Sequence, residues 1–275
     1  MEKPLVPGYI IERVISSRGG SAVIYFGRDI SEWKPVAIKQ LYPHMIRTLD
    51  LLREYEFYQC ISHPNITRCL DFVVNQRGEG FLVMEYVKGM TLNEYQNHRV
   101  GLMPDDVAKP VIMQLLDAVG HIHKKNILHL DIKRNNIILD DNMKIKLLDF
   151  GISRWQNEFQ TNWPAFGTLD YMSPEQLQGL NLDKYTDIYA IGVTLYFMLT
   201  GKSPFYGENA KMKKGNILNG NYISPKEHYP YINENWLPVL ERALSWHYKY
   251  RYQSCEEMAY DIDKRINLKK RKHIF

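Results

Sequence analysis

The stretch HLDIKRNN, residues 129–136, decides the expected fold of this 275-residue chain. It sets Asp131 and Asn136 five residues apart and directly precedes a predicted hairpin over residues 137–148. Asp and Asn residues form the predicted turn of that hairpin. The triplet Asp149-Phe150-Gly151 closes its second strand. Acidic, basic and amide side chains therefore gather in one loop and at one strand end, which indicates a site of polar chemistry.

On either side of this stretch, the pattern of apolar residues changes once along the chain, from strand-like to helical. The first part has short apolar runs typical of strands, at about 9–15, 23–26, 35–41, 69–74 and 81–84. One helical stretch, at about 49–61, interrupts them. Beyond residue 90 the apolar spacing is helical, with helices predicted at about 104–122, 186–199, 234–245 and 254–268. The sequence predicts an α+β fold in which a small β-rich region precedes a larger helical one. A cleft between two such regions is a natural small-molecule site.

The composition is that of an ordinary globular protein, with 45% hydrophobic and 24% charged residues. This balance argues against a disordered or collagen-like chain. The three cysteines include no CxxC pair and no zinc-like spacing, so buried or half-buried thiols in a reducing compartment are expected.

No signal peptide is predicted at the N-terminus. The longest uncharged stretch, residues 188–201, has 14 residues, whereas about 20 are needed to span a bilayer. We therefore expect a buried helix there, no integral membrane span, and a cytoplasmic protein.

Two more segments accompany the loop and the triplet. Val36-Ala37-Ile38-Lys39 places a lysine at the end of a predicted strand, and Ser173-Pro174-Glu175 begins 24 residues after Asp149. In this order and at this spacing, the segments resemble the eukaryotic-type (Hanks-type) protein kinase family, in its Ser/Thr branch and most like its bacterial members. The resemblance covers about residues 9–265.

The resemblance implies the bilobal protein kinase fold, with a small β-rich N-lobe and a larger, mainly helical C-lobe. The expected limits are an N-lobe over about 9–84, a hinge over about 85–89 and a C-lobe over about 90–265. A basic tail, residues 266–275, would follow.

The implied activity is transfer of the γ-phosphate of ATP to Ser or Thr hydroxyls of protein substrates, with autophosphorylation. In such a reaction the protein positions the reactants and neutralises phosphate charge. Lys39 is expected to hold the α- and β-phosphates, and Glu54 to orient Lys39. Asp131 would accept or orient the proton of the acceptor hydroxyl, and Lys133 would steady the transferred phosphate. Thr168 would hydrogen-bond Asp131 and Lys133.

Glu54 has one rival. It precedes His63-Pro64-Asn65-Ile66 by nine residues, as the family requires, but Glu56 lies nearby. Two positions along a helix correspond to a rotation of about 200°, so only one of the two carboxylates can face Lys39. A solvated helix carboxylate is the alternative for Glu54.

The resemblance also assigns the nucleotide and metal sites. Asn136 and Asp149 offer hard oxygen ligands for Mg²⁺, with Mn²⁺ as an alternative. The backbone of Glu85 and Val87 would hydrogen-bond adenine, with Met84 as the gatekeeper residue. The remaining nucleotide contacts are expected from apolar residues around the base and from the Gly-rich loop: Ile15, Gly19, Ile24, Ala37 and Ile138.

The chain departs from the family pattern in three places. In the Gly-rich loop only Gly19 matches, and this predicts weaker or slower ATP handling. Leu130 stands where the family usually has an arginine that receives the phosphate of the activation loop, so activity should depend little on loop phosphorylation. Arg134 and Asn135 replace the usual Pro and Glu. Arg134 adds positive charge near the substrate cleft or is a solvated loop arginine.

Several features favour Ser/Thr as acceptors. Lys133 follows Asp131 by two residues, and residues 167–175 resemble the substrate-docking segment of Ser/Thr kinases. Structural roles implied by the resemblance are an ion pair between Glu175 and Arg251 and hydrogen bonds from the catalytic-loop backbone to Asp187. Thr161 and Ser153 are the two candidate sites of phosphorylation between Gly151 and Gly167.

Three alternatives stay open on the sequence alone. The first is a pseudokinase that acts as a scaffold, which the incomplete Gly-rich loop allows. The second is a kinase of small molecules, although such enzymes lack the Ser-Pro-Glu segment. The third is a nucleic-acid-binding protein, for which no zinc site or recognition helix is found. Protein substrates and a regulatory partner protein are the expected partners.

The net charge of +4 is concentrated at the C-terminus. Six of the 35 basic residues and no acidic residue lie from Lys264 onward, which leaves 29 basic against 31 acidic residues elsewhere. The segment Lys264–Lys272 is therefore either a solvated end or a contact site for anionic lipid or nucleic acid.

Overall fold

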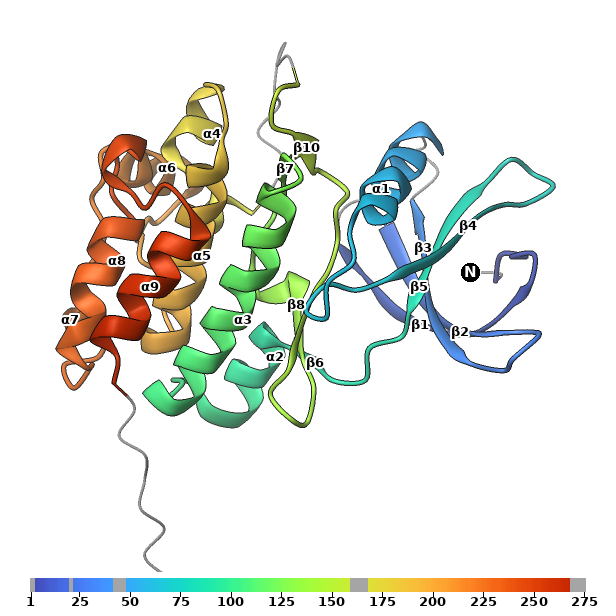
Figure 1. Ribbon diagram of the computed structural model, residues 1–275, viewed down its shortest axis with the longest axis horizontal. Helices are drawn as coiled ribbons and strands as arrows, with labels where there is room; N and C mark the ends of the chain where they lie inside the picture. The colour runs from blue at the N-terminus through green and yellow to red at the C-terminus, as the bar shows by residue number, and fades with distance from the viewer. Residues whose placement is uncertain (1–2, 20–21, 42–47, 159–167, 268–275) are drawn as a thin grey trace, which may run out of the picture.

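The computed structural model describes residues 3–19, 22–41, 48–158 and 168–267. Figure 1 shows two lobes, one built on a twisted sheet with a single helix and the other mainly helical. The predicted α+β fold with a small β-rich lobe before a larger helical lobe is confirmed. The exact lobe limits stay predictions.

The N-terminal lobe is a five-stranded antiparallel sheet in the order β1-β2-β3-β5-β4. Val36, Ile38, Phe81 and Val83 are buried between its strands and the N-terminal segment. Helix α1 lies against β4 and β5 and forms the second layer of the lobe, beside the sheet. The bounds are β1 Tyr9–Gly19, β2 Ala22–Asp29, β3 Pro35–Leu41, α1 Thr48–Cys60, β4 Cys69–Val74 and β5 Gly80–Glu85.

The C-terminal lobe is a helical body with short strands on the side that faces the sheet. Its α-helices are α2 Leu92–Tyr95, α3 Asp105–His123, α4 Pro174–Gln178, α5 Lys184–Thr200, α6 Ala210–Leu218, α7 Pro225–His228, α8 Leu237–Ala243 and α9 Cys255–Arg265. Short helical turns are η2 Gln96–Val100, η3 Arg134–Asn136, η4 Leu169–Tyr171, η5 Glu234–Trp236 and η6 Tyr248–Tyr250. The strands are β6 Met90–Thr91, β7 Ile127–Leu128, β8 Ile137–Leu139, β9 Ile145–Leu147 and β10 Arg154–Trp155.

Helix α5 forms the centre of this lobe. Every residue from Thr186 to Thr200 is buried, which confirms the buried helix predicted from the uncharged stretch. Asp183 caps its N-terminus, and Gly201 ends it with a left-handed φ of 70°. In the described segments, no helix is both long enough and apolar enough to cross a membrane.

Two predicted helices differ from the observed ones for a local reason. The stretch predicted at 234–245 is divided into η5 and α8, and Pro238 occupies the first turn of α8, where its missing N–H costs nothing. Conversely, α3 continues through Pro110, although proline inside a helix removes a backbone hydrogen bond. Pro110 lies near the start of α3 and is exposed, as is Asp106, whose carbonyl loses its helical partner there.

The cysteines follow the expectation in part. Cys255 is buried and Cys69 is half-buried, but Cys60, the last residue of α1, is exposed. The expectation for Cys60 was wrong because the end of α1 turns away from the sheet's core.

Candidate active site

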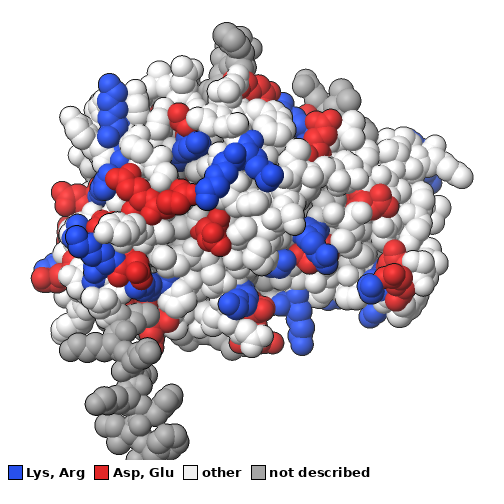
Figure 2. All heavy atoms as spheres, viewed as in Figure 1, with Lys and Arg blue, Asp and Glu red and all other residues white. Residues whose placement is uncertain are grey.

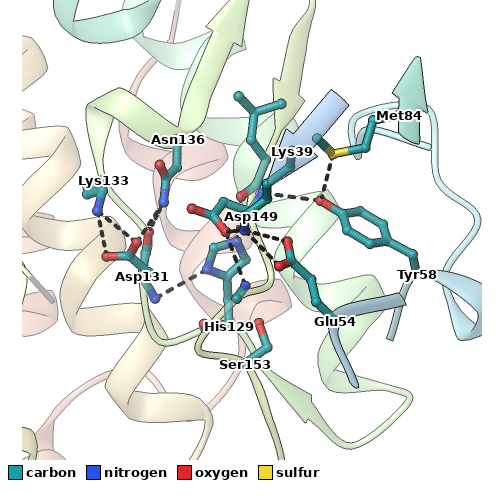
Figure 3. A network of polar contacts seen from close by, with 12 residues as sticks. Lys39, Glu54, Tyr58, Met84, His129, Asp131, Lys133, Asn136, Asp149 and Ser153 are labelled. Atoms are coloured by element: carbon teal, nitrogen blue, oxygen red, sulfur yellow. Dashed lines mark hydrogen bonds and ion pairs between the residues drawn. The ribbon is translucent and has the colours of Figure 1, made fainter. Parts of the chain in front are cut away.

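Three charged side chains from three separate elements meet between the lobes. The Nζ atom of Lys39, on β3, lies 2.7 Å and 2.9 Å from the carboxylate oxygens of Glu54, on α1. The same Nζ atom lies 2.6 Å from Oδ1 of Asp149, which follows β9 (Figure 3). Glu56 is exposed, so the helical spacing selected the correct glutamate.

The charges of this cluster are coupled. Burial alone would lower the pKa of Lys39, but the carboxylates of Asp149 and Glu54 raise it above its usual value. Burial would raise the pKa of Asp149, yet the Lys39 ammonium holds it well below its usual range. Burial raises the pKa of Glu54 to about 7 against the opposing effect of Lys39. At neutral pH the cluster therefore presents a charged lysine and an ionised Asp149.

The backbone of Asp149 is in the left-handed region, with φ of 64°. The N–H of Gly151 donates to Asp149 Oδ1 at 3.2 Å. A Cβ atom at Gly151 would lie 3.0 Å from that oxygen and 3.2 Å from Lys39 Nζ, so a larger residue would crowd both groups. Glycine at this position thus leaves room for the contact between Lys39 and Asp149.

Tyr58 connects α1 to this bend. Its hydroxyl accepts a hydrogen bond from the Asp149 N–H at 3.2 Å and lies 3.9 Å from the sulfur of Met84 on β5 (Figure 3). Its ring packs edge-on against the buried Phe150, with ring centroids 4.9 Å apart. Nothing in the sequence motifs singled out Tyr58, although it lies one helical turn after Glu54 on the same face.

We expect Tyr58→Phe to lower catalytic efficiency about tenfold, mainly through a higher KM for the metal–nucleotide complex. The variant leaves the Asp149 N–H without its partner, and such a loss costs about 1–3 kcal/mol. Steady-state kinetics at varied metal concentration measure the effect. Tyr55→Phe removes a hydroxyl from the same helix and should change nothing. An unchanged metal dependence in Tyr58→Phe would refute the role of the hydroxyl.

A second polar cluster is formed by the loop of residues 129–136. Lys133 Nζ donates to both carboxylate oxygens of Asp131, at 3.0 Å and 2.7 Å. The Asn136 amide nitrogen donates to the Asp131 carbonyl and to its Oδ2, each at 2.9 Å (Figure 3). Burial raises the pKa of Asp131, and Lys133 opposes that shift. With its nitrogen held in this way, Asn136 keeps its side-chain oxygen for another partner.

The loop is anchored from below by α5. Oxygens of the fully buried Asp187 accept hydrogen bonds from the backbone N–H groups of His129 at 2.9 Å and Leu130 at 2.8 Å. His123 Nε2 lies 2.8 Å from the same carboxylate. This confirms the contact predicted for Asp187.

Leu130 is buried in a small apolar cluster with Leu128 and Leu182, and its backbone adopts a left-handed φ of 65°. The position that carries an arginine in typical relatives is thus part of the apolar interior. Ser153 is buried as well, and its hydroxyl donates to the His129 carbonyl at 3.2 Å. Ser153 is therefore inaccessible as a phosphorylation site in this conformation, whereas Thr161 lies outside the described residues.

The predicted pairing of Glu175 with Arg251 is confirmed. The guanidinium donates to both oxygens of Glu175, at 2.7 Å and 3.0 Å, and both side chains are fully buried. Arg251 also donates to the carbonyls of Ser245 and Trp246. The pair fixes α4 against the segment before α9.

Two expectations are not met. The side chain of Thr168 is exposed and, within the described residues, has no hydrogen bond to Asp131 or Lys133. The carboxylate of Asp131 instead has Lys133 and Asn136 as partners. The solvated alternative for Arg134 is wrong: its side chain is half-buried, with its Cζ atom 3.9 Å from the centre of the Phe197 ring.

The residues expected around adenine surround the junction between the lobes. Ala37, Ile24 and Ile138 are half-buried, whereas Ile15 on β1 is 42% exposed. The backbone of Gly19 pairs with Ala22 across the β1–β2 turn. The N–H of Glu85 donates to the Arg68 carbonyl at 3.0 Å, so this N–H is not available to a ligand. Val87, two residues on, is half-buried.

The site has three features: a lysine held by a helix glutamate, an aspartate at a strand end, and a loop with Asp, Lys and Asn. A known protein family matches this chain. The family model for the protein kinase domain matches residues 12–261. The chain belongs to the protein kinase family.

Three similar proteins come from bacteria. The kinase is 34% identical over 261 residues to the serine/threonine-protein kinase PrkC of Bacillus subtilis, covering 92% of this chain and 40% of PrkC. It is 34% identical over 265 residues to the probable serine/threonine-protein kinase PknB of Lactococcus lactis, covering 92% of this chain and 41% of that protein. It is 30% identical over 254 residues to PknB of Mycobacterium leprae, covering 89% and 41%. The resemblance to bacterial members of the Ser/Thr branch is confirmed, and the chain spans about two fifths of the length of these relatives.

Proposed function

We propose that this kinase transfers the γ-phosphate of ATP to Ser and Thr hydroxyls of protein substrates and that it phosphorylates itself. The observation that carries this proposal is the assembled cluster around Lys39, whose Nζ contacts Glu54 at 2.7 Å and Asp149 at 2.6 Å. A scaffold that had lost catalysis would have no need to keep this geometry.

The donor set fits a divalent metal bound with ATP. Asp149 is ionised and keeps 39% of its side chain exposed, and the Asn136 oxygen is the free end of an amide already held by Asp131. Both are hard oxygen ligands, which suit Mg²⁺ or Mn²⁺. When bound, the metal would supply positive charge against the phosphates.

The chain's own residues divide the remaining work. Lys39 would hold the α- and β-phosphates, with Glu54 as its orienting partner. Asp131 would accept the proton of the acceptor hydroxyl or orient that hydroxyl, which is a role that a carboxylate can take as a general base. Lys133, now paired with Asp131 at 2.7 Å, would turn to the transferred phosphate. Thr168 would join them when substrate is bound.

The nucleotide would lie between the lobes. Its base would pack between Ala37 and Ile138 and hydrogen-bond the carbonyl of Glu85 and the N–H of Val87. Ile15, Gly19 and Ile24 would cover it from the β1–β2 side. Because only Gly19 of the Gly-rich pattern is present, we expect a KM for ATP above that of relatives with the full pattern.

The test is transfer of label from γ-labelled ATP to a generic protein such as myelin basic protein, with Mg²⁺, with Mn²⁺ or with EDTA. We expect transfer with a divalent metal and none with EDTA, and the comparison of the two metals identifies the preferred one. Nucleotide binding without any transfer would support the pseudokinase alternative and contradict the proposal.

We expect Thr161→Ala to retain activity within about threefold of the parent. Leu130 is apolar and buried, so the usual arginine partner for a phosphate on this segment is missing. Initial rates on an added protein acceptor measure the effect, because autophosphorylation alone would confuse loss of a site with loss of activity. A loss of 100-fold or more, in a variant that melts at the parent temperature, would contradict this expectation.

The proposal also covers the location of the kinase and its partners. We place the kinase in the cytoplasm, with protein substrates and a regulatory partner protein. On the face shown in Figure 2, basic and acidic side chains lie interspersed, which favours no extended polyanion site on that face. Contact of the tail Lys264–Lys272 with anionic lipid or nucleic acid stays a prediction, and the part of the tail from residue 268 lies outside the described residues.

A further inference from the structure

We propose that Arg134 is a positioning residue that fixes the spacing between the catalytic loop and the segment after Thr168, and thereby sets the affinity for the protein acceptor. The inference rests on the proposed kinase function. It concerns a position where the family pattern has proline and where the sequence offered only a free or solvated charge.

Arg134 is held on three sides. Its Nε donates to the hydroxyl of Tyr171 at 3.1 Å, and its Nη1 donates to the side-chain oxygen of Gln96 at 3.0 Å. Its Cζ lies 3.9 Å from the centre of the Phe197 ring, within the range of a cation–π contact. Two N–H groups of the guanidinium and one of its faces are therefore engaged by neighbouring side chains.

The partners of Arg134 also contact one another. The rings of Tyr171 and Phe197 stack with centroids 5.5 Å apart and an angle of 25° between their planes. The side-chain nitrogen of Gln96 donates to the Phe197 carbonyl at 2.8 Å. Arg134 thus joins three side chains that already contact one another, and Phe197 connects the network to α5.

The network joins two parts of the active site. Arg134 opens the turn η3, and Asn136 at the other end of that turn holds Asp131 at 2.9 Å. Tyr171 ends the turn η4, which begins directly after Thr168. The catalytic loop and the segment after Thr168 are therefore connected through the Arg134 side chain, beside a second link in which the Gln176 side chain donates to the Leu130 carbonyl at 3.3 Å.

The turn η4 has a second support on its other side. Asp170 accepts hydrogen bonds from the Ser203 hydroxyl and the Lys213 ammonium, each at 2.7 Å. These contacts fix η4 to the segment after α5 and to α6, but they do not reach the catalytic loop. Arg134 connects the catalytic loop to η4 through Tyr171 and to η2 through Gln96.

The chemistry requires arginine and not only a positive charge. A guanidinium is planar and offers five donors in a fixed fork, whereas a lysine ammonium is a point charge on a flexible stem. Lysine at position 134 would keep the charge but could not contact Tyr171, Gln96 and the Phe197 face together. Arg134→Lys therefore separates positioning from simple attraction of an acidic substrate.

The experiment compares the parent, Arg134→Lys and the control Arg77→Lys, an exposed arginine in the β4–β5 turn. For each, the KM for a protein acceptor, the KM for ATP and kcat are measured, and the melting temperature verifies folding. We expect Arg134→Lys to raise the KM for the acceptor about tenfold with the KM for ATP within twofold, and Arg77→Lys to match the parent. Tyr171→Phe should raise the acceptor KM in the parent but add little in Arg134→Lys, because both remove the same contact.

The outcomes distinguish the two proposals. If the parent transfers phosphate and Arg134→Lys has the parent's acceptor KM, the positioning role is wrong while the kinase function stands. Equal increases in both KM values would also refute it, because they would indicate general damage. If the parent transfers no phosphate with any metal, the proposed function fails and this inference fails with it.

Discussion

Asp131→Asn is expected to lower kcat by about 10²- to 10⁴-fold, the range that a positioned general base contributes. The asparagine cannot accept a proton, but its oxygen can still accept from Lys133, which donates to Asp131 at 2.7 Å in the parent. The loop should therefore keep its shape, since Asp187 holds the backbone of His129 and Leu130 from α5. The loss should appear in kcat and leave nucleotide affinity nearly unchanged.

Initial phosphotransfer rates and a separate nucleotide-binding titration measure these two quantities. Asp117→Asn is the matched control, because Asp117 is 72% exposed on α3, where its carboxylate lies 3.2 Å from His63 Nε2. Retention of more than a tenth of the parent rate in Asp131→Asn would contradict a role for this carboxylate in the chemical step.

Glu175→Ala is expected to destabilise the folded protein by about 3–5 kcal/mol, the usual cost of removing one partner of a buried ion pair. The change leaves the Arg251 guanidinium fully buried without its carboxylate, although the carbonyls of Ser245 and Trp246 still accept from it. Thr186 also loses a partner, because its hydroxyl donates to Glu175 at 2.9 Å. Glu175→Gln keeps some of these hydrogen bonds, so its free energy of unfolding should lie between those of the parent and of Glu175→Ala.

Urea unfolding monitored by circular dichroism gives the free energies of unfolding. Glu234→Ala removes one partner of an exposed ion pair with Lys226 and should leave the urea midpoint where it is in the parent. If Glu175→Ala unfolded at the parent's midpoint, the pair would not support the lobe in the way proposed. If Glu175→Ala does not fold, the midpoint of Glu175→Gln decides the question.

The parts of the site that the sequence predicted are those in which local spacing determines geometry. Lys39 ends a strand, Glu54 lies on a helix, and a two-residue shift to Glu56 rotates the side chain by about 200°. The loop from Asp131 to Asn136 could be identified from the order and spacing of its residues, but the hydrogen bonds of Lys133 and Asn136 to Asp131 were not predicted. The long buried helix could be predicted from the uncharged stretch because burial excludes unpaired charge.

The parts that the sequence missed depend on partners far along the chain. Arg134 was predicted to add positive charge near the substrate cleft or to be a solvated loop arginine. Its contacts with Gln96, Tyr171 and Phe197, on three other elements, were not predicted. Thr168 was assigned hydrogen bonds from the family pattern, whereas Asp131 is already paired within its own loop. Helix α6 was missed because Gly215 and its lysines weaken any apolar periodicity.

Leu130 shows what structure adds to a departure found in the sequence. The sequence established only that the usual arginine is missing. The structure places Leu130 among Leu128 and Leu182, so the position contributes to packing under the catalytic loop. This is why we expect activity to depend less on a phosphate on Thr161 than in relatives that carry the arginine.

The central claim is transfer of the γ-phosphate to serine and threonine, and phosphoamino acid identification tests it most directly. The protein is incubated with a protein acceptor, Mg²⁺ or Mn²⁺, and ATP labelled in either the γ- or the α-phosphate, and the acceptor is then hydrolysed. The account predicts labelled phosphoserine and phosphothreonine from γ-labelled ATP only, and none with Asp131→Asn. Label confined to phosphotyrosine, label from the α-phosphate, or no label in the parent would contradict it.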